Sequence, residues 1–188
     1  MTGILEKYTQ EILDLTNDIT NRGYDFAWVL TEIDGIQFSL MNNPDDSLAE
    51  FMELYSVVQA HQSRLVSIII SIRKEKQVWL KFKYSVDGLF KKLRNTLLSS
   101  RTDIQILKSQ ELRDGKINEE LEPLVNLQRI ISGVFDDLEY LIEVCELKKD
   151  DLDKANTNMS RQQKVVETLI GLGYLAKKYK NDNSDQGY

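Results

Sequence analysis

The sequence predicts an all-α fold, an elongated antiparallel bundle of three long helices of the coiled-coil kind. Apolar residues recur every three or four positions over almost all of the 188 residues, which is the spacing of a helix seam. Charged residues make up 29% of the chain, whereas it holds only 9 glycines and 2 prolines. That balance favours helix over sheet or disorder, and no stretch shows the alternation of a strand.

The first predicted helix covers residues from about 4 to 41. Its apolar positions keep a spacing near 3.5 residues throughout. Gly23 lowers the helix propensity by about 1 kcal/mol relative to alanine, so we expect a kink or a break at residues 21–24. Asn43 suits a helix N-cap and Pro44 suits the first helical position, which predicts a tight turn before the second helix.

The second helix is the longest and is predicted from residue 44 to residue 113. Gly88 and the polar residues 99–103 are weak points, because glycine and short polar side chains favour a break. The apolar spacing nevertheless continues through both, so we expect one helix with bends. A tight reversal at Asp114–Gly115 should end it.

The third helix is predicted from about residue 123 to residue 180. Its nearly apolar-free stretch, residues 155–164, is where we expect a break or an exposed crossing. Residues 181–188 are polar and should form a disordered tail. Residues 1–180 would then make up a single elongated unit.

The lengths of these helices restrict how they can pack. At a rise of about 1.5 Å per residue, the first helix is roughly half as long as the second. Because short turns make antiparallel neighbours, the first helix would cover only the first half of the second. The bundle would be three helices thick at one end. At the other end it would be a helical hairpin, built from residues 82–113 and the start of the third helix.

The predicted hairpin carries more apolar residues than a two-helix seam can cover. The seam itself is expected to pair Leu93 and Leu97 with Leu127 and Ile131. Apolar surface beyond such a seam is typical of an association site. Its occupant would be one or two helices of another helical protein or of a second copy of this chain. The candidate partner-binding residues are Leu89, Leu98, Ile106, Val125, Ile130 and Phe135.

Residues 73–101 carry nine basic side chains and two acidic ones, in a chain whose net charge is −6. Pairing with acidic residues of the third helix would explain this segment without any external ligand. An acidic protein or an anionic membrane are alternatives, whereas a pI near 5.0 argues against a general nucleic-acid binder. The candidate basic patch consists of Arg73, Lys74, Lys76, Lys81, Lys83, Lys91, Lys92 and Arg94.

No group of residues indicates catalysis, a metal site, a cofactor or a small-molecule substrate. The chain has one histidine, His61, and one cysteine, Cys145, whereas zinc and di-iron sites need several such ligands. Cys145 lies in an apolar helical pattern, which predicts a buried side chain. A single cysteine favours a reducing compartment, and we see neither a signal peptide nor a transmembrane segment. We therefore expect an intracellular protein.

Three long antiparallel helices resemble the layout of spectrin-type repeats, the N-terminal bundle of syntaxins, BAR domains and small coiled-coil subunits of kinetochore or tethering complexes. This resemblance is one of architecture and does not determine function. The sequence predicts a non-enzymatic scaffold subunit of a larger intracellular complex, acting by helix–helix association. The alternative is a peripheral membrane or vesicle-tethering module that binds anionic lipid through the basic patch.

Overall fold

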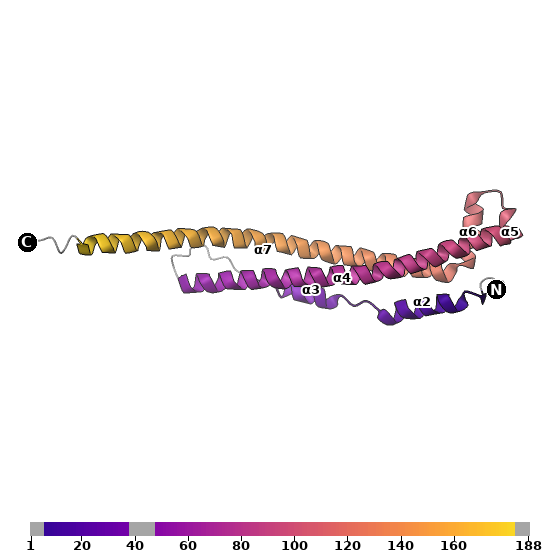
Figure 1. Ribbon diagram of the computed structural model, residues 1–188, viewed down its shortest axis with the longest axis horizontal. Coiled ribbons are helices and arrows are strands. Elements are labelled where there is room, and N and C mark those ends of the chain that lie inside the picture. The colour runs from indigo at the N-terminus through magenta and orange to yellow at the C-terminus, as the bar shows by residue number, and fades with distance from the viewer. Residues whose placement is uncertain (1–5, 38–47, 183–188) are drawn as a thin grey trace, which may run out of the picture. The chain divides into compact units, whose positions relative to one another are not determined.

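The computed structural model describes residues 6–37 and 48–182, and they are almost entirely helical (Figure 1). About 90% of these residues are in helices and none of them forms a strand. The predicted all-α class is therefore confirmed. The predicted turn at Asn43–Pro44 and most of the predicted tail lie outside the described residues.

The helices are α2 (Thr9–Arg22), α3 (Ala27–Asp34), α4 (Leu48–Ser100), α5 (Thr102–Gln105), α6 (Gln110–Glu120) and α7 (Glu122–Asp182). The chain divides into two compact units. Unit 1 consists of residues 1–28 and 70–142, and unit 2 consists of residues 29–69 and 143–188. The two long helices, α4 and α7, contribute to both units. That residues 1–180 behave as a single unit stays a prediction.

The first predicted helix is in fact two helices, α2 and α3, separated by residues 23–26. Gly23 has φ 57° and ψ 175°, a conformation that is essentially restricted to glycine, and it ends α2. Asp25 then favours the start of α3, since its carboxylate accepts a hydrogen bond from the Ala27 amide at 2.9 Å. The expected break is confirmed. The predicted continuation of the helix beyond Asp34 is wrong, because the chain turns at the glycine that follows.

The second predicted helix is continuous through Gly88 but ends at Ser100, well short of residue 113. The hydroxyls of Ser99 and Ser100 both donate to the Thr96 carbonyl, at 3.0 and 2.6 Å. Such side-chain bonds compete with the helical ladder in its last turn. Arg101 follows with an extended backbone (φ −103°, ψ 105°), so the weak point noted in the sequence is a true helix end.

The chain reverses through α5 and α6. Ser109 caps α6, because its hydroxyl accepts a hydrogen bond from the Leu112 amide at 3.2 Å. The predicted reversal at Asp114–Gly115 is wrong, since both residues lie inside α6. The stronger capping signal lies five residues earlier, at Ser109.

The third predicted helix is confirmed as α7, but the break expected at residues 155–164 does not occur. Ala155 and Met159 are only 2% and 1% exposed, and they continue the spacing of the fully buried Leu152. Two apolar residues at helical spacing are enough to keep this face of α7 packed, while Thr157 and Asn158 between them are exposed.

In unit 1, α4 and α7 run antiparallel (Figure 1). Lys76 Nζ lies 2.7 Å from Glu139 Oε1, and Gln128 Nε2 donates to Asp87 Oδ1 at 2.7 Å. A step of eleven residues along α4 is thus matched by eleven residues back along α7. Burial confirms the predicted seam, because its members Leu93, Leu97, Leu124, Leu127, Ile131, Val134 and Leu138 are at most 3% exposed.

A third helix, α2, lies against this pair in unit 1. Arg22 pairs with Glu75, and Lys92 Nζ lies 4.7 Å from the centre of the Tyr8 ring, so α2 runs antiparallel to α4. The residues before and within α2 therefore reach into the predicted hairpin as far as Lys92 of α4.

Unit 2 combines α3 with the N-terminal half of α4 and the C-terminal half of α7. Gln62 Nε2 donates to Asp153 Oδ1 at 2.6 Å, which sets the register of α4 and α7. Arg64 Nε donates to Glu32 Oε2 at 2.6 Å, which ties α3 to α4. The fully or nearly fully buried residues of this unit include Val29, Ile33, Phe51, Val58, Leu65, Cys145, Leu152, Ala155 and Met159.

Candidate functional site

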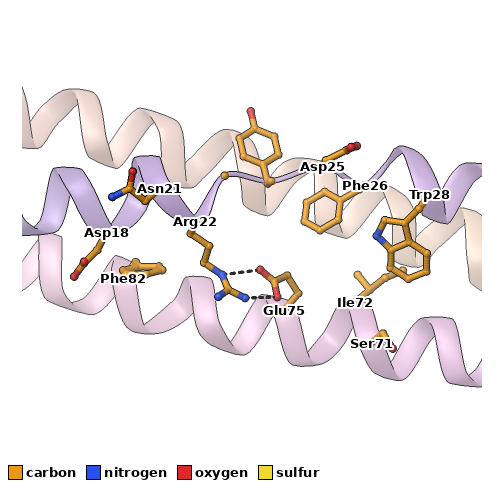
Figure 2. A pocket seen from close by; sticks show the side chains of 12 residues that line it. Asp18, Asn21, Arg22, Asp25, Phe26, Trp28, Ser71, Ile72, Glu75 and Phe82 are labelled. Atoms are coloured by element: carbon orange, nitrogen blue, oxygen red, sulfur yellow. Dashed lines mark hydrogen bonds and ion pairs between the residues drawn. The ribbon is translucent and has the colours of Figure 1, made fainter.

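A hollow of about 690 Å³ opens in unit 1 where α2 ends beside α4 (Figure 2). We call it the aromatic hollow, because four aromatic side chains line it together with three acidic residues and one basic residue. The aromatic residues are Tyr24, Phe26, Trp28 and Phe82, and the charged residues are Asp18, Asp25, Glu75 and Arg22.

An ion pair fixes one wall of the aromatic hollow. Arg22 Nε and Nη2 donate to the two oxygens of Glu75, at 2.9 and 2.6 Å, as the dashed lines in Figure 2 mark. Trp79 Nε1 also donates to Glu75, at 3.1 Å. The hydrogen bonds that Arg22 donates to Glu75 raise the pKa of Arg22 above its ordinary value. The two side chains are therefore already engaged with each other.

Aromatic contacts hold the chain between α2 and α3 against α4. The Tyr24 ring lies 6.0 Å from the Trp79 ring in an edge-to-face arrangement and 6.1 Å from the Phe26 ring. Trp79 is fully buried and packs 5.6 Å from Phe82. Tyr24 and Trp28, by contrast, are 49% and 47% exposed. Aromatic surface therefore stays accessible in the hollow.

Sequence reasoning missed this hollow. It interpreted residues 21–24 as a helix break only. The signal available in the sequence was a set of three aromatic residues within five positions, from Tyr24 to Trp28, directly after a glycine. Only the packing of α2 on α4 brings them beside Phe82 and Glu75.

The side chains of the basic patch predicted from the sequence make different kinds of contact in unit 1. Lys76 pairs with Glu139, and Arg94 Nη2 lies 2.8 Å from Asp114 Oδ1. These hydrogen bonds lower the pKa of Glu139 and of Asp114. Lys83 and Lys92 lie over the rings of Phe135 and Tyr8, at 5.5 and 4.7 Å. The remaining members are exposed side chains, namely Arg73, Lys74, Lys81 and Lys91.

The candidate partner-binding residues differ in their accessibility. Leu89 is only 4% exposed and belongs to the core of unit 1. Leu98, Val125 and Phe135 are half-buried. The two accessible members are Ile106 and Ile130, at 74% and 45% exposed. Their role in binding stays a prediction.

A second apolar surface lies in unit 2, near the end of α7. We call it the α7 end stripe, and it consists of Val165, Leu169, Ile170 and Leu172, which are 59%, 53%, 56% and 58% exposed. Residue 169 continues the spacing of Leu152, Ala155 and Met159, so the buried seam of α7 runs on into solvent-exposed positions.

The register of unit 2 explains the exposure of Leu169, Ile170 and Leu172, whereas Val165 lies opposite residue 50 of α4. Gln62 lies opposite Asp153. The first residue of α4, Leu48, is fourteen residues before Gln62, and Glu167 is fourteen residues after Asp153. Leu169 and the residues after it therefore lie beyond the start of α4, and the described residues place no helix over them.

A comparison with family models, with curated proteins and with solved structures finds no match to this chain. Within residues 6–37 and 48–182, no group of three or more His, Cys, Asp or Glu residues could hold a metal ion. None of the helices in those ranges combines the length and the apolar character that crossing a bilayer requires. The helix surfaces described above are thus what a functional proposal has to explain.

Proposed function

We propose that this chain is a non-enzymatic subunit that joins a larger assembly by helix–helix association. The observation that carries the proposal is the α7 end stripe, in which a helix seam continues past the described part of the helix that covers it. Apolar residues at seam spacing are the surface that another helix recognises. The occupant would be a helix of another protein or of a second copy of this chain.

The energy available in the α7 end stripe is moderate. Complete burial of a Val, Leu or Ile side chain is worth about 1.5–3 kcal/mol, and these four are a little over half exposed. Covering all four would give roughly 3–6 kcal/mol before the entropy cost of association. The stripe therefore supports association and needs further contacts to make it tight.

Co-purification with matched variants tests this proposal. The stripe variant carries Leu169→Gln and Leu172→Gln. The control variant carries Lys164→Gln and Glu167→Gln, which lie about 140° and 160° from Leu169 around the helix axis. We expect the tagged wild-type chain and the control to retain the same partners from their own cells, and the stripe variant to lose them at equal helix content. Equal recovery of all partners by the stripe variant would contradict the proposal.

The alternative function, binding to an anionic membrane surface, has one observation in its favour. Lys74, Lys81 and Lys91 are exposed, and their spacing places them within about 100° of one another around α4. Clustered lysines attract anionic headgroups in a salt-dependent way. Flotation with vesicles containing phosphatidylserine at low salt, compared with neutral vesicles, tests it. If the chain floats with neither kind of vesicle, membrane binding is excluded.

A further inference from the structure

A groove of about 640 Å³ lies in unit 1 between α2, the end of α6 and the first turn of α7. We call it the α2–α7 groove, and its lining is largely apolar. Leu121 and Leu124 contribute nearly fully buried side chains, while Pro123 beside them is exposed. Leu13 of α2 is 47% exposed on the other side of the groove. The groove therefore offers apolar surface to side chains of a further helix.

The charged residues that line the α2–α7 groove are mainly acidic, with three glutamates against one lysine. Glu119 forms an ion pair with Lys116 at 2.8 Å. Glu120 lies 3.4 Å from Arg101. Glu122 is exposed in the first turn of α7 and pairs with no other described residue. The groove therefore favours an occupant that brings basic residues with its apolar ones.

The two ends of the chain that carry these apolar surfaces have opposite charge. Residues 6–22 and 110–122, which border the groove, contain nine acidic and four basic residues, a net charge of −5. Residues 161–182, which contain the α7 end stripe, have five basic and two acidic residues, a net charge of +3. Two stripes would therefore repel each other, whereas a stripe and a groove attract.

The α7 end stripe also has the spacing with which a helix enters a groove. Val165, Leu169 and Leu172 stand at positions i, i+4 and i+7, which places them on one face of α7. All three are more than half exposed. Seating this face in the groove would cover apolar surface on both partners.

We propose that the α7 end stripe of one copy of this chain occupies the α2–α7 groove of another copy. The inference rests on the proposed association of helices, and it names the partner and the surface that receives the stripe. Because the two surfaces differ, the contact is heterologous, and it joins copies into a ring or an open chain. A helix of another protein would need the same basic and apolar pattern, which this chain already contains.

Sedimentation equilibrium of the purified full chain tests the proposal. We expect the average mass to rise with protein concentration between about 1 and about 200 µM, the range of a weak specific contact. The association should weaken at least threefold between about 50 and about 500 mM NaCl, because salt screens the opposite charges. A monomer at all concentrations, or an association that high salt strengthens, would overturn the proposal.

A matched pair of variants locates the groove. The groove variant, Leu13→Gln with Glu122→Gln, should associate at least tenfold more weakly than the wild type. The control, Leu112→Gln with Glu111→Gln, also removes an exposed leucine and a first-turn glutamate from unit 1, but outside the groove, and should associate normally. Equal affinities of the two variants would overturn the proposal. If the groove variant loses helix content, Glu122→Gln alone replaces it, and wild-type affinity there would also overturn it.

A mixture of variants distinguishes this contact from a symmetric one. The groove variant keeps the stripe, and the stripe variant described above keeps the groove. Each alone should stay monomeric, whereas an equimolar mixture should form dimers and nothing larger. A groove variant that associates with itself, or a mixture without dimers, would overturn the proposal.

Co-purification separates this inference from the proposed function. If the purified chain stays monomeric while the stripe variant still loses its partners from cells, only this inference fails. If the stripe variant associates as the wild type does and keeps all partners, both fail.

Discussion

Replacing Leu152 and Leu169 by alanine, one at a time, tests whether the α7 end stripe is truly uncovered. Both are leucines on α7 at the same seam spacing, in the same unit. Leu152 is 0% exposed, whereas Leu169 is 53% exposed. The pair therefore keeps residue type, helix and helix face constant and changes only whether another helix covers the side chain.

The expected magnitudes differ clearly. Leu152→Ala removes a buried side chain and leaves a cavity, which costs about 2–5 kcal/mol. For a chain of this size each kcal/mol shifts the melting temperature by about 2–4 °C, so Tm should fall by at least about 4 °C. Leu169→Ala removes side-chain atoms of which about half are already in contact with water, and it leaves no cavity. Its cost should therefore be about 1 kcal/mol or less.

Thermal and urea unfolding of the dilute purified chain, followed by circular dichroism, provide the comparison. We expect a marked loss of stability for Leu152→Ala and almost none for Leu169→Ala. Equal destabilisation by the two substitutions would refute the reasoning, because Leu169 would then be part of a core in solution and the stripe would not be free for a partner.

Three further predictions follow from individual residues. Gly23→Ala should destabilise the chain by about 1–3 kcal/mol because of its φ of 57°, whereas Gly88→Ala, exposed inside α4, should stabilise it by about 0.5–1 kcal/mol in the same unfolding assay. Cys145 is fully buried and burial raises its pKa, so a thiol reagent should react with it only after denaturant is added. The hydrogen bond from Arg101 lowers the pKa of Asp103 from 3.8 to about 2; its stabilising effect should be complete above pH 4 and lost as pH falls through 2, which NMR titration of the Asp103 carboxyl can follow.

The apolar spacing predicted the helical class and most of the buried positions, because it reports which side of a helix is covered. The burial of Leu93, Leu97, Leu127 and Ile131 follows directly from it. The break after α2 was also predictable, since glycine is the weakest helix former apart from proline. These features depend on local sequence alone.

The ends of the helices and the aromatic hollow depend on more than local sequence. Asp114–Gly115 resembles a turn but lies inside α6, while the reversal follows Arg101, whose residue type does not demand an extended backbone. The aromatic hollow requires α2 to pack beside Glu75 and Phe82 of α4. Sequence spacing does not give the register between two helices, so the hollow could not be foreseen.

Site-specific photo-crosslinking in the protein's own cells tests the central claim most directly, because it captures a partner whose identity is unknown. A photoreactive amino acid is placed at Leu169 in one variant and at Lys164, on the opposite side of α7, in the other. We expect discrete adducts of higher mass from position 169 and few or none from position 164. An absence of adducts at position 169, or the same adducts from both positions, would contradict association through this end of α7.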